Sequence, residues 1–307
     1  MHASGGPLAW AIFGVLVVGM LALDLGVFHR KAHVVRGREA AIWSLVWIGL
    51  ALAFNLGIYL YWGADRGLEF FQAWLIEKAL SVDNLFVFLA AFSYFAVPEN
   101  LQHRVLFWGI LGALITRGVF IAVGAALLAA FHWVTYIFGA FLVLTGGRLL
   151  FGDGEEVKPE GNPVLRLFRR FVRTTPDYDG PHFVARRDGL LYATPLLMVL
   201  VVIEASDVVF AVDSIPAVFG VTRDVFIVYT SNIFAVLGLR ALTFLVARLV
   251  RRLRYLKPAL ALVLAFVGAK MLIGDKVHIS DVMSLLVVTG LIGAAALLSL
   301  IFPPKQE

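Results

Sequence analysis

Long apolar runs separated by short polar breaks dominate this chain of 307 residues. Each run is close to the roughly 20 residues that a helix needs to cross a hydrocarbon core about 30 Å thick. The pattern therefore predicts an all-α polytopic membrane protein with about nine transmembrane helices. The expected spans are 8–28, 40–62, 69–95, 105–129, 133–151, 190–219, 224–248, 257–274 and 281–301.

These spans form one transmembrane domain over residues 1–307, with two leading spans (8–62) and a last span (281–301). Lys and Arg gather in alternate loops, and the polar interval 152–189 holds many of them. Because cytoplasmic loops of membrane proteins carry the excess of cations, we expect 152–189 to be a cytoplasmic basic loop. The N-terminus is then outside and the C-terminus cytoplasmic, in a bacterial inner membrane. The cations follow the first apolar run, which is the reverse of a secretory signal.

Spans three to five (69–151) resemble spans six to eight (190–274). Three spans are an odd number, so the second copy must cross the membrane in the opposite sense. Such a 3+3 inverted repeat, with the binding site between its halves, recurs among transporters. The landmarks that repeat are Gly146-Gly147-Arg148 with Gly268-Ala269-Lys270 at an offset of 122, Arg117 with Arg240 at 123, and Asp83 with Asp207 at 124.

Composition agrees with a membrane protein, because 61% of residues are hydrophobic and only 15% are charged. A soluble domain carries about 25% charged residues. The net charge of +5 follows from the basic loops, so we expect no nucleic-acid partner. The chain has no cysteine, which excludes disulfides, thiolate metal sites and thiol redox chemistry. We find no phosphate-binding glycine loop and no nucleophilic triad, and we expect no enzymatic activity.

Two apolar segments, 77–88 and 202–216, carry several carboxylates. A buried carboxylate costs several kcal/mol unless it meets a partner. We therefore expect the two segments to meet at mid-membrane and to bind a divalent cation. An oxygen-rich set without Cys suits Mn²⁺, Mg²⁺ or Ca²⁺ better than Zn²⁺ or Cu⁺. The candidate ligands are Glu77, Asp83, Asn84, Glu204, Asp207 and Asp213.

Glu204 and Asp207 share a helix face, whereas Asp213 lies about 120° away on an ideal helix. Pro216 predicts a broken or kinked segment at 212–216, which would turn Asp213 back and free carbonyls as ligands. Ser206, Ser214 and Asn232 are further candidate ligands or support, although such residues more often hydrogen-bond neighbouring helices.

The basic residues Lys78, Arg117 and Arg240 are expected to neutralise the acids when no ion is bound. The alternative is that the acids and these cations only hold helices together. Within the basic loop, apolar and arginine positions of 164–173 separate onto two helix faces, which predicts a helix on anionic lipid of the inner leaflet. The alternative there is a docking surface for a partner.

Several segments resemble the TerC family of integral membrane proteins, closest to its Alx branch, whose members respond to pH and manganese. The segments are Ala22–His33, Glu77–Asn84, Ala193-Thr194-Pro195 and Glu204–Pro216. The resemblance implies the LysE-like exporter group and Mn²⁺ efflux, beside the tellurium resistance that the family is named for. The family's acidic positions fall on Glu77, Asp83, Glu204, Asp207 and Asp213.

Residues and resemblance together favour an inner-membrane Mn²⁺ exporter that works by alternating access and is coupled to protons. No cofactor is expected to be tightly bound. Two other functions stay open. One is export of a small organic cation or amino acid. The other is membrane assembly or metal delivery through loop 152–189.

Overall fold

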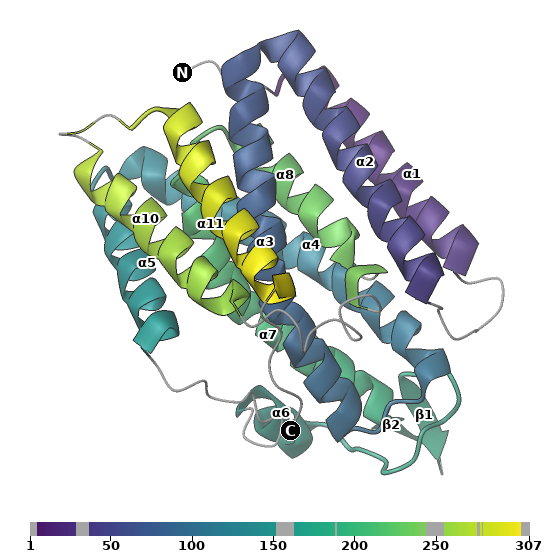
Figure 1. Cartoon of the computed structure of the whole chain (residues 1–307). Helices are drawn as coiled ribbons and strands as arrows, with labels where there is room; N and C mark the ends of the chain where they lie inside the picture. Colours follow the sequence, from purple (N-terminus) through teal and green to yellow (C-terminus); the bar gives the residue numbers. More distant parts are fainter. Residues whose placement is uncertain are drawn as a thin grey trace.

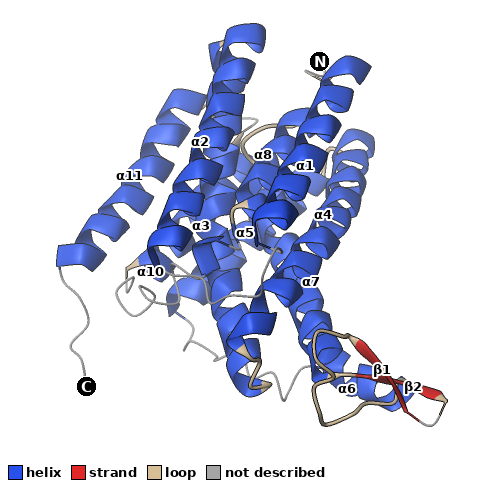
Figure 2. Cartoon of the chain, turned by 90° about the vertical axis from the view of Figure 1, so that its right-hand side faces the viewer, coloured by secondary structure: helices blue, strands red, loops and turns tan. Residues whose placement is uncertain are grey.

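The structure is a computed structural model, and it describes residues 5–28, 37–151, 163–187, 189–239, 241–243, 255–274, 277 and 279–301. It is a bundle of long helices with a small hairpin at one end (Figures 1 and 2). The hairpin pairs β1 (Val184–Arg187) with β2 (Leu190–Ala193) in antiparallel register. The helices are α1 (Pro7–Phe28), α2 (Gly37–Trp62), α3 (Ala64–Tyr94), α4 (Glu99–Ala130), α5 (Val134–Phe151), α6 (Pro163–Phe171), α7 (Pro195–Phe219), α8 (Val225–Leu237), α10 (Leu256–Ile273) and α11 (Asp281–Ile301).

Each predicted apolar run contains one of these helices, so the prediction of an all-α polytopic membrane protein is confirmed. Six described helices are long and apolar enough to cross a membrane: α2, α4, α5, α7, α10 and α11. The helix α3 carries too many charged residues to count among these apolar helices. Its 31 residues nevertheless extend about 46 Å, which is long enough to cross a bilayer. The number of helices that cross the bilayer stays a prediction.

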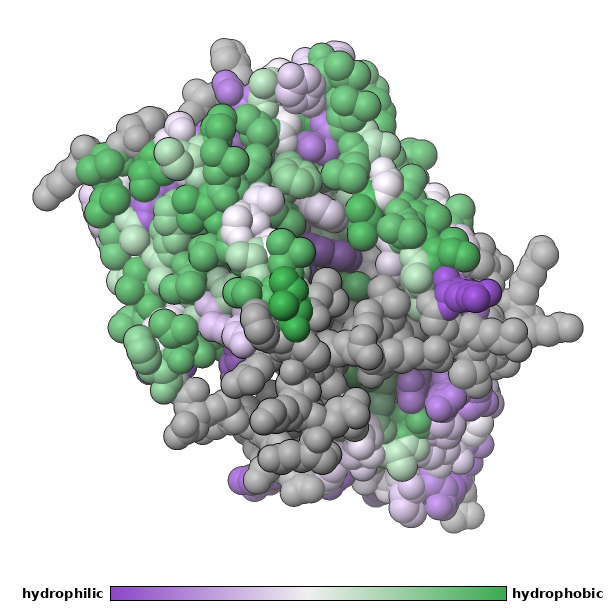
Figure 3. Space-filling view, in the orientation of Figure 1, coloured by the Kyte–Doolittle hydropathy of each residue, from purple (hydrophilic) through white to green (hydrophobic). Residues whose placement is uncertain are grey.

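The outer surface matches a bilayer environment. Large apolar side chains such as Leu8, Leu60 and Ile115 are 74%, 75% and 64% exposed. Figure 3 shows hydrophobic residues over the upper part of the face, with hydrophilic ones gathered at the lower right, the end that carries the hairpin. Exposed apolar area of this extent is not tolerated by a monomeric soluble protein.

One boundary prediction is wrong, because residues 190–193 form β2 and the helix begins only at Pro195. A residue before proline is driven to extended backbone, and Thr194 has φ −79° and ψ 166°. Proline suits the first helical position, so Pro195 starts α7. The Thr194 hydroxyl donates to the carbonyl of His182 at 2.8 Å, which ties the helix start to the hairpin.

Of the broken or kinked segment predicted at 212–216, the break is wrong, since α7 is helical from Pro195 through Pro216 to Phe219. Pro216 lies within the last turn, where its missing N–H leaves only the carbonyl of Val212 without its helical donor. The helix ends instead at Gly220, whose N–H donates to the carbonyl of Pro216.

The helices of the two predicted copies run in opposite senses: α3, α4 and α5 run down, up and down in Figure 1, and α7, α8 and α10 run up, down and up. The helix contacts agree with a correspondence of α3 to α7, α4 to α8 and α5 to α10. The contact of α3 with α8 then corresponds to the contact of α7 with α4, and α5 contacts its own counterpart α10. These relations are the ones an inverted repeat predicts. We call α3–α5 the first triplet and α7, α8 and α10 the second triplet.

The contact between α5 and α10 depends on glycine. A Cβ on Gly139 would lie 2.9 Å from the carbonyl oxygen of Gly268, and one on Gly146 would lie 2.6 Å from that of Ala261. At the sequence offset of 122, Gly146 corresponds to Gly268 and Gly139 to Ala261, so each contact maps onto the other. Small residues let membrane helices approach this closely.

Candidate ion site between the helix triplets

Arg117 on α4 is fully buried and binds acids from both triplets. Its Nη1 donates to Glu77 of α3, and its Nη2 donates to Asp207 of α7 at 2.9 Å. Nη1 also donates to the side-chain oxygen of Asn232 on α8 at 3.0 Å. Glu77 and Asn232 are 0% exposed and Asp207 is 3% exposed. The predicted meeting of the two acidic segments therefore takes place through a shared guanidinium.

This network does not satisfy all of its members. Among the described residues, Glu77 Oε2, Arg117 Nε and Asn232 Nδ2 are buried without a hydrogen-bond partner. A buried donor or acceptor left unpaired costs about 1–3 kcal/mol. Two carboxylates also face one guanidinium. The site therefore keeps unused binding capacity.

A cavity of about 150 Å³ lies beside the network. Glu77, Arg117 and Asp213 all line it, so Asp213 reaches the site from an unbroken helix. Thr145 of α5 lines the cavity together with Asp213. The remaining polar lining of the cavity comes from Ser81, Asn84 and Ser214. Asn84 Nδ2 and Ser214 Oγ are buried without partners in the described part of the chain.

Glu204 lies apart from this cavity. Its carboxylate lies against α4 at Gly112, in the space that a Cβ on that residue would occupy. Thr116, one turn further along α4, donates to the carbonyl of Gly112 at 3.1 Å and approaches Asp207 at 3.5 Å. The predicted shared face of Glu204 and Asp207 is thus the face that packs on α4.

Two predicted residues have other contacts. The ammonium of Lys78 donates to the carbonyl of Ala235, in the last turn of α8, at 3.0 Å. Cations favour that end of a helix because its carbonyls lack helical partners. The hydroxyl of Ser206 donates to Val202 of its own helix at 2.7 Å.

Two other predicted residues lie outside what the structure describes, namely the side chain of Asp83 and the whole of Arg240. Among the described residues, no three His, Asp or Glu side chains gather closely enough to hold a metal ion by themselves. Any cation in the cavity would therefore share carboxylates with hydroxyl and amide groups.

Sequence reasoning missed Thr145, Thr116 and Gly112. Thr145 was the only one with a signal, because it lies one residue from Gly146, which corresponds to Gly268 in the repeat. Nothing in the chain around Gly112 distinguishes it from the other glycines of its helix.

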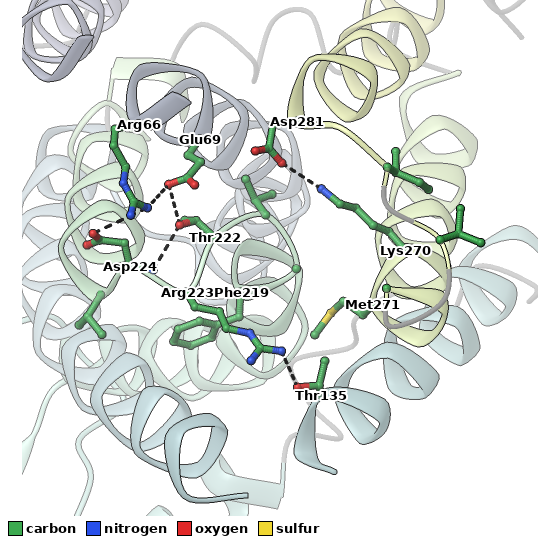
Figure 4. Close-up of a pocket in the computed structure, with 16 residues that line it drawn as sticks. Arg66, Glu69, Thr135, Phe219, Thr222, Arg223, Asp224, Lys270, Met271 and Asp281 are labelled. Atoms are coloured by element: carbon green, nitrogen blue, oxygen red, sulfur yellow. Dashed lines mark hydrogen bonds and ion pairs between the residues drawn. The ribbon is translucent and has the colours of Figure 1, made fainter. Parts of the chain in front are cut away.

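A second hollow, of about 510 Å³, opens at the end of the bundle opposite the hairpin. We call it the vestibule. It is lined by the start of α3, the connection between α7 and α8, and the facing ends of α5, α10 and α11 (Figure 4). Its charged residues are Arg66, Glu69, Arg223, Asp224, Lys270 and Asp281.

Buried apolar side chains separate the vestibule from the cavity. Glu69 borders the vestibule and Glu77 the cavity, and these two residues are eight positions apart on α3, about 12 Å along the axis. The side chains that fill this space belong to one apolar cluster, and they include Ala73, Ile76, Ile215, Val218 and Val267. We call these five residues the apolar layer.

The fold and the buried charges define a class: a polytopic helical membrane protein whose two helix triplets enclose an acidic polar centre. The model of the integral membrane protein TerC family matches residues 62–307, and the chain belongs to that family. The match begins at the end of α2, so α1 and most of α2 lie outside the segment that the family shares.

Relatives match along almost the whole chain. An uncharacterized membrane protein of Myxococcus xanthus is 52% identical over 297 residues, which cover 97% of this chain and 93% of that protein. An Escherichia coli K12 protein named "Putative membrane-bound redox modulator Alx" is 48% identical over 301 residues, with 95% and 94% covered. A membrane protein of Rickettsia felis is 41% identical over 280 residues, with 91% and 93% covered. No solved structure matches the chain.

Proposed function

We propose that this protein exports a divalent cation, Mn²⁺ in the first place, across the bacterial inner membrane by alternating access. The observation that carries the proposal is the fully buried Arg117, which bridges acids of both triplets beside a small polar cavity. A buried charge within a membrane-spanning bundle marks a functional site by default.

Charge matches the cargo. Glu77, Asp207 and Asp213 supply three carboxylates, and Arg117 supplies one positive charge. With every acid ionised, these four side chains leave two negative charges, which one divalent ion neutralises. The arriving ion would bind Glu77 and Asp213 from the cavity side and complete its shell with the oxygens of Asn84 and Ser214.

Volume favours an ion over an organic cargo. The cavity of about 150 Å³ holds about five waters at roughly 30 Å³ each. Sites for organic ligands usually measure about 300–1,000 Å³. A partly hydrated metal ion suits the smaller space, and this favours it over an amino acid or organic cation.

Ligand chemistry favours hard or intermediate ions. The described lining offers carboxylate, amide and hydroxyl oxygens, and the chain has no cysteine. Carboxylate and carbonyl oxygens suit Mg²⁺, Ca²⁺ and Mn²⁺. The absence of cysteine also means that the redox role in the name of the Escherichia coli relative would here need a route other than protein thiols.

We infer the direction from the cation pattern of the loops, which puts the hairpin end in the cytoplasm and the vestibule outside. Cargo would enter the cavity from the hairpin end and leave through the vestibule. Protons from outside would compete for the carboxylates and promote release.

In α6, Leu165 packs against the core, whereas Phe171 is 76% exposed near Arg169 and Arg170, so anionic lipid would meet only this outer face.

The test is Mn²⁺ uptake into inside-out vesicles that contain the protein. We expect Glu77→Gln and Asp213→Asn each to lower the initial rate at least tenfold. The matched control is Asp177→Asn, which removes one carboxylate whose side chain is 70% exposed outside the bundle, and its rate should match the wild type. Equal rates for all four proteins would refute the site, and uptake of lysine in place of Mn²⁺ would support an organic cargo.

A further inference from the structure

Polar contacts in the vestibule join the first triplet to the connection between α7 and α8. Glu69 of α3 accepts from the Thr222 hydroxyl at 2.8 Å and pairs with Arg66 at 2.7 Å. Arg66 also lies 3.9 Å from Asp224. Arg223 donates to the Thr135 hydroxyl at the start of α5 at 3.0 Å (Figure 4).

The connection that receives these contacts is fixed to α8. Asp224 caps the helix by accepting from the N–H of Phe226 at 2.9 Å and from that of Ile227 at 3.3 Å. The Thr222 hydroxyl accepts from the N–H of Asp224 at 3.2 Å. A movement of Thr222 therefore moves the start of α8 with it.

The same two helices reach the ion site. Glu69 precedes Glu77 by eight residues on α3. In the same way, Asp224, which caps the start of α8, precedes Asn232 within that helix by eight residues. Each pair is separated by about 12 Å along its helix. Glu77 and Asn232 both hold Arg117. The contacts in the vestibule and the contacts around Arg117 are thus two levels of one interface between α3 and α8.

The two levels differ in how easily they open. At the outer level, Arg66 and Glu69 have side chains that are 31% and 14% exposed, whereas Thr222 and Asp224 are buried, so water reaches this level only in part. Arg117 and Glu77 are each 1% exposed, and separating them leaves buried charge without a partner. Between the two levels lies the apolar layer, whose five side chains are buried and belong to one cluster.

We propose that Glu69, Thr222, Arg66 and Asp224 form the lock of an outer gate, which opens to let the cargo pass the apolar layer into the vestibule. The proposal rests on the proposed export function. A cation that draws Glu77 away from Arg117 loosens the α3–α8 interface at the inner level, and the outer level, which has no buried guanidinium between two acids, then separates.

The natural absence of cysteine allows a direct test. The double variant Glu69→Cys with Thr222→Cys is joined by a short, cleavable thiol cross-linker in vesicles. We expect cross-linking to lower Mn²⁺ flux at least tenfold and cleavage to restore it. The control pair is Lys270→Cys with Asp281→Cys, which joins α10 to α11 across a contact of 3.3 Å and should change flux less than twofold. Undiminished flux through the cross-linked Glu69–Thr222 pair, or an equal block by both pairs, overturns the gate.

A second readout does not depend on flux. Val218→Cys puts a single thiol in the buried apolar layer, and its reaction with a membrane-impermeant maleimide from the vestibule side is timed. We expect the rate to rise at least tenfold when Glu69→Gln and Thr222→Val are added. An unchanged rate overturns the lock even if Mn²⁺ flux is normal. A faster rate without Mn²⁺ flux in any variant supports the lock and refutes the proposed export of Mn²⁺.

Discussion

Arg117 on α4 and Asp207 on α7 form a buried ion pair of 2.9 Å, and the same guanidinium binds Glu77 on α3. The pair joins the two triplets at the centre of the bundle. A guanidinium there occupies the electrostatic position that a bound cation would take. The stability of the metal-free protein and its affinity for a cation should therefore respond in opposite ways to changes at Arg117.

The first prediction concerns Arg117→Gln. Removing one partner of a buried ion pair costs about 3–5 kcal/mol, because the remaining charges stay uncompensated. We expect the midpoint of thermal unfolding to fall in chelator. We also expect the stabilisation by saturating Mn²⁺ to exceed that of the wild type, since the ion then neutralises acids that lost their arginine.

The control for this variant is Arg148→Gln, which removes an exposed arginine at the end of α5. It should change neither the unfolding midpoint nor the response to Mn²⁺. If Arg117→Gln loses stability but gains no additional response to the metal, Arg117 is a structural link between helices and does not compete with a cation.

Gly112 offers a test of the position of Glu204. Gly112→Ala would place a methyl group where the Glu204 carboxylate lies, so the acid must move or the helices must separate. Because the carboxylate ends a flexible side chain that can move, we expect Gly112→Ala to gain none of the stability of up to about 1 kcal/mol that alanine gives at an open helical glycine position. Gly147→Ala on α5 is the matched control, because a Cβ there meets nothing within 4 Å. Replacing that helical glycine should stabilise by up to about 1 kcal/mol, and equal effects of both substitutions would contradict the placement of Glu204.

The glycine contact between α5 and α10 makes a prediction about architecture. Gly268→Val should disrupt the packing, because even a Cβ at that position would lie 2.6 Å from the carbonyl oxygen of Gly139. Gly290→Val on α11 is the control, since its Cβ position is open. Size-exclusion chromatography in detergent and the midpoint of thermal unfolding are measured for both variants. We expect only Gly268→Val to elute abnormally and to unfold at a lower temperature. Normal behaviour of Gly268→Val would mean that the triplets do not pack in this way.

The long apolar runs were enough to locate the helices. Membrane helices satisfy their backbone hydrogen bonds internally, and they therefore appear in the sequence as continuous apolar segments. The approach of Glu77 to Asp207 was also predictable, since acids in apolar segments need a common partner. The position of Asp213 was predicted by the wrong route. Its helix does not break at Pro216, and the cavity extends to Asp213 along α7.

Other features left no readable trace in the chain. Thr116 looks like an ordinary helix threonine until the neighbouring helix α7 brings Asp207 to it. The vestibule combines short connections of unremarkable composition from distant parts of the sequence. Residues 190–193 looked like the start of a span because they are apolar, and only the hairpin partner Val184–Arg187 makes them a strand.

The most direct test of the central claim is calorimetric titration of the purified, chelator-treated protein with Mn²⁺, compared with Asp213→Asn and with Asp281→Asn. Asp213 borders the central cavity, whereas Asp281 lies in the vestibule. The account predicts one Mn²⁺ per chain for the wild type and for Asp281→Asn, and affinity at least tenfold weaker for Asp213→Asn. Equal affinity in all three proteins, or no saturable binding to the wild type, would contradict it.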